Sequence, residues 1–363
     1  MIYVMITKVP FSYCEINFGL LKNSSLSELI AKDYNHSRII VFADENTYDH
    51  CLEYLFESCP IINDADVVVF PLGEENKIIE VTQQVLEALS NFKLKRNDLI
   101  INLGGGIVTD MGGFISSIYK RGIKFINIPT SLLGMVDASI GGKTGINFGS
   151  YKNQIGSFIH PVSIYIDSVF LKSLPQNEII NGYAEIIKHA LISDSKSWFE
   201  LSNKLEKNIQ PDDEVILKSI IYKTSIVEQD PSENGLRKIL NFGHTFGHAI
   251  EGFFVDKINV SHGFCVCLGI CAESYLSFKR GNISKDEYLQ IENSINRIID
   301  FIPFDKEAIN EIYELMKQDK KNKGDHILSC LLINIGECQY DQEISEAEIM
   351  DTMYHLNLLA GTN

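Results

Sequence analysis

The stretch DLIINLGGGIVTDMGGF, residues 98–114, decides the fold class. Its first part, Asp98–Leu103, is a short run rich in isoleucine and leucine, which predicts a strand. Three glycines, Gly104–Gly106, follow this strand directly, and a helix is expected to start after them, around Asp110. A strand that runs through a glycine-rich turn into a helix is a building unit of a parallel α/β sheet.

The same alternation extends to both sides of this stretch. Four further short apolar runs predict strands at Arg38–Ala43, Ala65–Phe70, Lys124–Ile128 and Ser163–Asp167. Helical patterns separate these runs. We therefore expect an α/β domain over residues 1–169, with a doubly wound, mostly parallel, Rossmann-like sheet.

After Pro175 the strand-like runs nearly vanish and helical spacing of apolar residues takes over. This predicts a second, all-α domain over residues 170–363, with no internal repeat. Open parallel sheets bind ligands at the carboxyl ends of their strands, so a cleft between the two domains is expected. The predicted helices are Glu178–Ile192, Glu214–Glu228, Thr245–Phe254, Phe264–Leu276, Lys285–Phe301 and Asp305–Gln318.

Composition excludes several classes of protein. The chain has 363 residues, of which 45% are hydrophobic and 22% charged, which excludes disordered and fibrous proteins and favours two folded domains. The formal net charge of −16 argues against nucleic acid as a partner, because binding to phosphates needs basic patches. An anionic ligand would need a local pocket of cationic side chains and backbone amides.

Membrane and disulfide signals are absent from the sequence. No apolar run approaches the roughly 18–20 residues of a membrane span, and Met1–Cys14 does not have the layout of a signal peptide. We therefore expect a cytoplasmic protein that does not contact membranes. The eight cysteines form no CxxC pair, which predicts reduced thiols that pack as small hydrophobic side chains.

The glycine-rich turn is a candidate site for a dinucleotide. Amides at the amino end of a helix carry partial positive charge, and glycines let a pyrophosphate approach them. The spacing is not GxGxxG, however, and a glycine cluster after a strand is often only a tight turn. Asp44 and Asn46, just after the first predicted strand, are candidates for ribose hydroxyls or for an Asx turn that caps the next helix.

The segment Ile128–Gly156 is dense in glycine and hydrogen-bonding side chains, and we interpret it as a long functional loop between two strands. Lys143, Lys152 and Asn153 within it can bind a phosphate through two ammonium groups and one amide. The alternative is a solvated surface loop.

Three histidines and a carboxylate form a candidate metal site. His244 and His248 are four residues apart on a predicted helix, so both imidazoles point to one face, and His262 follows closely. Glu185 lies on another helix, one turn before Lys188. One carboxylate and two histidines form a zinc site with coordination positions left open for a substrate. Spacing favours His244 and His248 as the pair, but does not decide whether His262 displaces one of them.

Taken together, several stretches resemble the dehydroquinate synthase family, and the resemblance extends from Asp44 to about Gly336. The matching stretches are GGGIVTDMGGF (104–114), YKRG (119–122), IPTSLLGMVDASIGGKTGIN (128–147), YKNQIGSF (151–158), GYAEIIKHALI (182–192), RKILNFGHTFGHAIE (237–251), SHG (261–263) and DKK (319–321).

The resemblance implies an NAD-binding amino-terminal domain, a helical carboxy-terminal domain, and one divalent metal, usually zinc, with cobalt as a substitute. By resemblance the metal ligands are Glu185, His244 and His262, which differs from the pair favoured by spacing. The residues that match the family's cofactor contacts are Asp44, Asn46, Glu74, Lys77, Gly105, Gly106, Ile107, Asp110, Thr130 and Ser131, together with Lys143 and Lys152.

The resemblance also implies a phosphorylated keto-acid substrate. Its phosphate would be held by Lys143, Asn153 and His248, with Lys321 nearby and Arg121 reaching in from the second subunit of a homodimer. The other matching positions are Asp137, Lys152, Lys188, Lys223, Arg237 and Asn241. Of these, Lys223, Arg237 and Asn241 match carboxylate-binding positions, with Arg237 and Asn241 expected on one helical face.

The family's reaction converts 3-deoxy-D-arabino-heptulosonate 7-phosphate to 3-dehydroquinate and phosphate, a lyase step of the shikimate pathway for aromatic amino acids. Alternatives are a sister cyclase of the 2-epi-5-epi-valiolone or 2-deoxy-scyllo-inosose synthase type, and a metal-dependent polyol dehydrogenase. A polyol carries no phosphate and would leave the lysine cluster without a role.

The chain departs from the family pattern at Phe264, because a glutamate usually follows the histidine-glycine pair there. A lost carboxylate would alter how His262 is oriented. It would also suit a weakly active paralogue kept for binding. We favour a change in packing, because Phe264–Leu276 has the pattern of a buried helix.

Overall fold

The computed structural model describes residues 6–149, 151–206, 210–255, 257–258, 260–318 and 326–361. The chain divides into two compact units. The first comprises residues up to Pro175 together with Lys223–Glu228, and the second comprises Gln176–Tyr222 and Gln229 onward. None of the described helices combines the length and apolar character that a bilayer crossing demands.

The first unit contains a seven-stranded sheet in the order β1-β2-β9-β6-β5-β3-β4. Only β1 and β2 pair antiparallel to each other, and the other pairs are parallel. All five predicted strands are confirmed, and β1 and β2 were not predicted. The strands are β1 (Thr7–Val9), β2 (Glu15–Phe18), β3 (Ile39–Asp44), β4 (Asp66–Phe70), β5 (Leu99–Gly104), β6 (Lys124–Pro129) and β9 (Ser163–Ile166).

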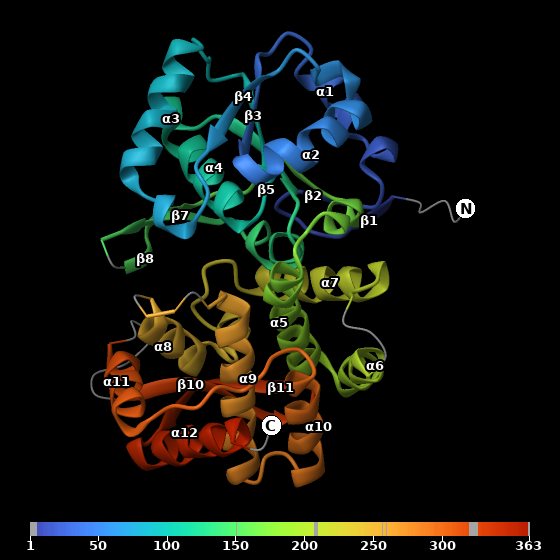
Figure 1. The fold of residues 1–363 in the computed structure, drawn as a ribbon. Helices are drawn as coiled ribbons and strands as arrows, with labels where there is room; N and C mark the ends of the chain where they lie inside the picture. The colour runs from blue at the N-terminus through green and yellow to red at the C-terminus, as the bar shows by residue number, and fades with distance from the viewer. Residues whose placement is uncertain are drawn as a thin grey trace. The chain divides into compact units, whose positions relative to one another are not determined.

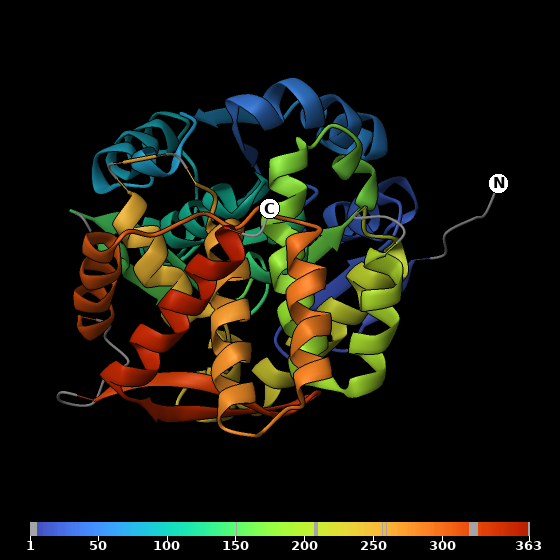
Figure 2. The ribbon, with the colours of Figure 1, turned by 60° about the horizontal axis from the view of Figure 1, so that its bottom comes forward.

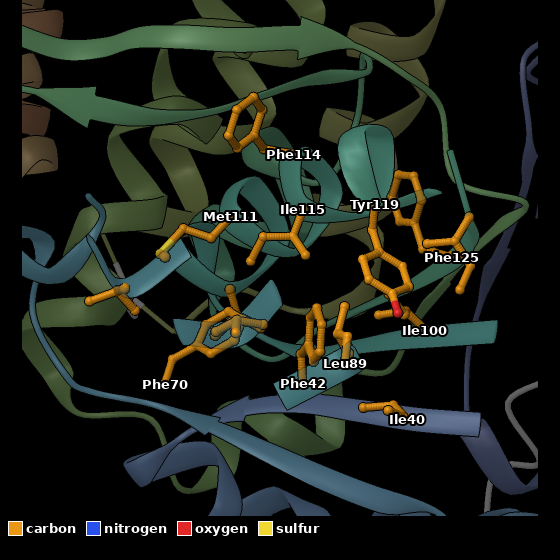
Figure 3. Packing of buried hydrophobic residues seen from close by; sticks show 14 of the residues in the cluster. Ile40, Phe42, Phe70, Leu89, Ile100, Met111, Phe114, Ile115, Tyr119 and Phe125 are labelled. Atoms are coloured by element: carbon orange, nitrogen blue, oxygen red, sulfur yellow. The ribbon is translucent and has the colours of Figure 1, made fainter. Parts of the chain in front are cut away.

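Helices cover both faces of this sheet, as the doubly wound prediction requires (Figure 1). Ile40, Phe42 and Ile100 pack with residues of α3 (Ile79–Asn91) and α4 (Gly106–Ile118) in one buried cluster (Figure 3). Successive strand residues point to opposite faces of a sheet. Val41 and Ile101 therefore point to the face opposite that cluster, and α2 contacts the sheet as well. The remaining helical segments are η1 (Leu21–Asn23), α1 (Leu26–Asp33), α2 (Glu45–Ser58), η2 (Pro60–Ile62), η3 (Glu74–Asn76), η4 (Tyr119–Arg121) and η6 (Ser168–Lys172).

The segment predicted as a long loop, residues 128–156, is largely regular, so that prediction was wrong in structure. It contains a π-helical turn, η5 (Gly134–Ala138), and an antiparallel hairpin of β7 (Lys143–Phe148) and β8 (Tyr151–Phe158). The hairpin packs on α4, and Ile146 joins the buried cluster of the sheet. Its glycines Gly145 and Gly156 face each other closely, which explains why a stretch so rich in glycine still forms strands.

The second unit is built around α9 (His262–Lys279), which contacts α5, α8, α10, α12 and β10. Figure 2 shows α9, α10 and α12 side by side above the strands. The predicted helical character is confirmed, but an antiparallel pair, β10 (Ile327–Asn334) and β11 (Glu337–Ile344), was not expected. The other elements are α5 (Gln176–Ser193), α6 (Ser195–Leu205), α7 (Asp213–Gln229), η7 (Leu236–Asn241), α8 (His244–Phe254), α10 (Lys285–Asn296), α11 (Lys306–Lys317) and α12 (Glu346–Ala360).

The thiols have the character that the sequence predicted. All eight cysteines are free, and seven of them are buried. Burial raises the pKa of Cys14, Cys51 and Cys271 to about 12 in each case, which keeps these thiols protonated and unreactive at neutral pH.

Close packing of α8 on α9 depends on Gly269. A Cβ at this position would collide with the carbonyl oxygen of Gly243 and the amide of Gly247. We expect Gly269→Ala to destabilise the protein by about 1–3 kcal/mol, the usual cost of overpacking, and to weaken metal binding because α8 and α9 carry His244 and His262. Thermal unfolding and zinc titration measure both effects.

Gly252→Ala provides the matched control for this prediction. Gly252 is exposed on α8, and its added Cβ would meet only methyl groups of Leu315 at 3.5 Å or more. We expect it to raise stability by roughly 0.5–1 kcal/mol through helix propensity. An equal change in stability and in zinc affinity in the two variants would contradict the argument that Gly269 is needed for close packing of α8 on α9.

Candidate active site

The glycine-rich turn presents a helix amino terminus at the end of β5. Gly105 precedes α4 in an extended conformation, and no acidic residue lies in the first turn of the helix. A Cβ on Gly105 would lie 3.1 Å from the hydroxyl oxygen of Ser131, so glycine keeps the turn close to that side chain. Gly105, Gly106 and Ile107 are all partly accessible. The turn therefore offers free amides and a favourable dipole to an anion.

Lys77, Asp110 and Asn153 meet in one polar cluster. The Lys77 ammonium, whose side chain is 4% exposed, donates to Asp110 Oδ2 and to Asn153 Oδ1, each at 2.6 Å. Burial raises the pKa of the Asp110 carboxyl, and the neighbouring ammonium opposes that shift. Two residues predicted at the cofactor and one predicted at the phosphate are thus in direct contact.

The other predicted cofactor residues occupy varied environments. Asp44 accepts a hydrogen bond from the amide of Thr47 at 2.8 Å and caps α2, which is the structural alternative proposed for it. Asn46 is exposed on α2, and Glu74 accepts from the amide of Asn147 at 2.9 Å. Thr130 and Ser131 are buried after β6.

The predicted phosphate-binding residues of the hairpin are accessible. Lys143 begins β7, Lys152 and Asn153 lie on β8, and all three are exposed. Arg121 is also exposed and lies in a turn where Lys120, Arg121 and Gly122 all have positive φ, which is a strained conformation for the first two. Lys321 lies outside the described residues.

Lys223 and Asp137 form an ion pair within the first unit. The ammonium of Lys223 donates to the carboxylate of Asp137 and to its carbonyl oxygen, the latter at 2.6 Å. The side chain of Lys223 is only 6% exposed, so its charge is compensated where it is buried. Two residues that the sequence grouped only by resemblance are thereby brought together.

In the second unit, three imidazoles lie together, and the carboxylate of Glu185 lies next to one of them. Ring nitrogens of His244, His248 and His262 lie within 4.8 Å of one another. Glu185 is 1% exposed, and its Oε1 lies 3.5 Å from His244 Nε2 without accepting a hydrogen bond from a described residue. Its other oxygen pairs with the buried ammonium of Lys188. A buried carboxylate oxygen without a hydrogen bond is costly in a metal-free protein, so the donor set fits a divalent metal such as zinc.

Two of the three imidazoles have hydrogen-bond partners of the kind that orient metal ligands. His262 Nδ1 lies 3.1 Å from Glu251 Oε2, and His244 Nδ1 lies 3.2 Å from the carbonyl oxygen of Phe242. Such partners fix the tautomer and leave Nε2 available for a metal. His248 is the exposed member of the three. This geometry is compatible with the set Glu185, His244 and His262 that the resemblance implies, and all three histidines lie close enough to share one metal ion.

Arg237 and Asn241 lie on η7, which is a 3-10 helix. The expectation of one shared α-helical face is therefore wrong, because residues four apart are about 120° apart around a helix with three residues per turn. Arg237 is 3% exposed and donates to the carbonyl of Pro231 at 2.7 Å. Asn241 donates to Glu233 at 2.7 Å.

Comparison with known proteins identifies the family. The amino-terminal domain model of 3-dehydroquinate synthase matches residues 67–181, and the carboxy-terminal domain model matches residues 182–322. The 3-dehydroquinate synthase of Parabacteroides distasonis is 40% identical over 324 residues, which are 88% of this chain and 91% of that protein. The chain belongs to the 3-dehydroquinate synthase family.

Solved structures share the fold of this family member. A 2-deoxy-scyllo-inosose synthase, complexed with carbaglucose-6-phosphate, NAD+ and Co2+, matches with a TM-score of 0.84 at 21% identity, covering 97% of this chain and all of that one. The 2-epi-5-epi-valiolone synthase of Streptomyces hygroscopicus subsp. jinggangensis 5008, with NAD+ and Zn2+ bound, matches with a TM-score of 0.82 at 24% identity, covering 96% and 98%.

One residue of this 3-dehydroquinate synthase family member was not predicted from the sequence: Glu251, whose carboxylate lies beside His262. It lies on α8, seven residues after His244, and that spacing on one helical face was the available signal. Because Glu251 supplies a carboxylate to His262, the phenylalanine at position 264 leaves that histidine with a partner. Phe264 itself is half-buried, and its amide is capped by Ser261.

Removing the carboxylate behind His262 is expected to weaken metal binding without abolishing it. We expect Glu251→Gln to lower zinc affinity about 10- to 100-fold, because a ligand's hydrogen-bond partner typically contributes that much. Competition with a chromophoric chelator measures the affinity. Phe264→Glu is the comparison, and we expect that variant to change the affinity less, because His262 already has an acceptor.

Proposed function

We propose that the chain is a 3-dehydroquinate synthase, which converts 3-deoxy-D-arabino-heptulosonate 7-phosphate to 3-dehydroquinate and phosphate in the shikimate pathway. The observation that carries this proposal is the buried carboxylate of Glu185 next to His244, together with the hydrogen bond between His262 and Glu251. This arrangement occurs in a chain 40% identical to a named 3-dehydroquinate synthase.

We propose NAD and one divalent metal, zinc or cobalt, as the cofactors. When bound, NAD accepts and returns a hydride and the metal acts as a Lewis acid on the reacting alcohol and ketone. Gly105, Gly106 and Ile107 would offer backbone amides to the pyrophosphate. Lys188 pairs with one oxygen of the buried Glu185 carboxylate, so that the other oxygen, which faces His244, would be the one to bind the metal.

The chain's own polar and charged side chains would bind the phosphate. Lys143, Asn153 and His248 would hold this group, and the ammonium of Lys143 would neutralise the charge that develops on it as it leaves. By orienting the phosphate, they would also place one of its oxygens to accept the ring proton that is lost in the elimination. Arg237, Asn241 and Lys223 would bind the carboxylate.

We further propose the organisation around this reaction. Residues 1–169 would form the NAD-binding domain and residues 170–363 the metal- and substrate-binding domain. The protein would act in the cytoplasm as a homodimer, with nucleic acid and membranes playing no part.

Product identification tests the function directly. The purified chain is incubated with the heptulosonate phosphate, NAD+ and zinc, and the products are identified by mass spectrometry. We expect 3-dehydroquinate and one equivalent of phosphate, with no net accumulation of NADH. Net NADH would instead support a polyol dehydrogenase, and turnover only of a sugar phosphate without a carboxylate would support a sister cyclase.

The proposed homodimer predicts complementation between inactive chains. Arg121 is exposed at a strained turn, and the proposal has it reach the substrate of the other subunit. Mixing Arg121→Ala chains with Lys143→Ala chains should restore partial activity, because half of the sites in a mixed dimer then have both residues. No recovery in verified heterodimers would show that each subunit works alone.

A further inference from the structure

Asn147 joins two segments for which different ligands are proposed. It lies on β7 and is 9% exposed. Its side-chain amide donates to Glu74, to Oε1 at 2.9 Å and to the carbonyl oxygen at 3.3 Å, and its own backbone amide donates to the carbonyl of Lys77 at 2.7 Å. Its Oδ1 accepts from the backbone amide of Asn153 at 2.8 Å. Both ends of this buried amide are therefore used, one on each segment.

The bond to Asn153 stabilises an irregular part of the hairpin. Ile146 pairs with Ile155 and Phe148 with Tyr151, so Asn147 stands alone opposite residues 152–154. This is a bulge, and Asn153 within it has φ of +50°, in the left-handed region. Such a conformation persists only where the surroundings impose it. Asn147 thus determines how Lys152 and Asn153 are presented.

Lys77 is hydrogen-bonded to both Asn147 and Asn153. Its ammonium donates to Asn153 Oδ1 as well as to Asp110, while its carbonyl accepts from Asn147. Lys77, Asn147 and Asn153 therefore form a closed ring of hydrogen bonds. A displacement of the segment Glu74–Lys77 would be passed to the bulge, and a displacement of the bulge would be passed back.

We infer that Asn147 is a positioning residue that couples cofactor binding to phosphate binding. The inference rests on the proposed function, because the family resemblance behind that function assigns Glu74, Lys77 and Asp110 to NAD and Asn153 to the phosphate. A ligand that orders one side of the ring leaves less to be ordered by the second ligand, so each raises the affinity for the other. The coupling must be equal in both directions.

Calorimetric titration of the full chain with NAD+, with and without saturating inorganic phosphate, tests this. In the wild type we expect phosphate to tighten NAD+ binding by about 5- to 50-fold, within the usual range of coupling between sites. In Asn147→Ala the two NAD+ affinities should agree within about twofold, because the ring is broken. The thermal unfolding temperature of each variant is measured to confirm that it folds.

Ser157→Ala is the matched control. Ser157 lies on the same hairpin and bonds Thr144 and Ser117, each at 2.9 Å, at the end away from the bulge. We expect its coupling to equal that of the wild type. Equal loss in Ser157→Ala and Asn147→Ala would reduce the role of Asn147 to general hairpin stability and would overturn the inference.

A rescue experiment separates positioning from folding. Asn147→Asp keeps the acceptor for Asn153 but sets a carboxylate against Glu74, so the coupling should be lost. Adding Glu74→Gln restores a donor and an acceptor to the side-chain contact but not the bond to the carbonyl oxygen of residue 74, so part of the coupling should return. Full coupling in Asn147→Ala, or in Asn147→Asp alone, would overturn the inference.

The proposed function is judged by product formation and the inference by binding. A wild type that couples phosphate to NAD+ but makes no 3-dehydroquinate would contradict the function and support the inference. A wild type that makes the product without any coupling would overturn the inference and support the function.

Discussion

Glu185→Gln and His244→Ala are each expected to abolish bound zinc, whereas His248→Ala is expected to retain it. Glu185 and His244 face each other at 3.5 Å with little exposure, and His262 is held by Glu251, while His248 is exposed. Losing one of three protein ligands removes most of the affinity of a catalytic zinc site. Metal content per chain after gel filtration, measured by mass spectrometry, gives the result.

Activity should be lost in all three variants, but for different reasons. In His248→Ala we expect full metal content with a large fall in kcat, because that imidazole would contact the leaving phosphate. Glu185→Gln is chosen over alanine because it fills the same buried volume beside Lys188. A metal-free His248 variant with a metal-loaded His262→Ala would return the ligands to the pair four residues apart.

Arg237→Ala is expected to cost roughly 2–5 kcal/mol in transition-state binding of the heptulosonate phosphate, measured as kcat/KM. Arg237 is 3% exposed, and a guanidinium supplies two parallel hydrogen bonds to a carboxylate. An anion that loses this partner in a water-poor site is left poorly compensated. The loss should vanish for sedoheptulose 7-phosphate, which carries no carboxylate.

Lys238→Ala is the control for this prediction. Lys238 is the next residue on η7, but its ammonium pairs with Asp341 at 2.9 Å and is partly exposed. We expect it to leave kcat/KM nearly unchanged. A wild type that turns over sedoheptulose 7-phosphate as well as the keto acid would contradict the carboxylate assignment.

Much of the first unit could be predicted because its signals are local. The strands β3, β4, β5, β6 and β9 are short apolar runs, and β5 leads into Gly104–Gly106 and then α4. In a sheet covered on both faces, nearly every strand residue is apolar, so the pattern is readable without knowing the neighbours. The helices of the second unit were readable for a similar reason, since each buries one face.

Local patterns failed where pairing partners are distant or polar. The hairpin of β7 and β8 was taken for a loop because its glycines and polar residues hide the alternation that marks a strand. The strands β10 and β11 were missed within a region of helices. Arg237 and Asn241 were expected to share one helical face, yet η7 is a 3-10 helix, whose hydrogen bonds close over three residues.

The sequence by itself determined which functional groups are available: a glycine-rich helix start, a cluster of lysines, three histidines and a carboxylate. Only the tertiary structure decided which of these groups lie next to one another. Spacing favoured His244 and His248, because two residues four apart share a face, but a metal binds where ring nitrogens and a carboxylate oxygen come together, and His262 lies with both of them. Glu185 arrives from α5, and Glu251 orients His262 from α8. Such distances between atoms of separate helices are set by packing, which no local pattern records.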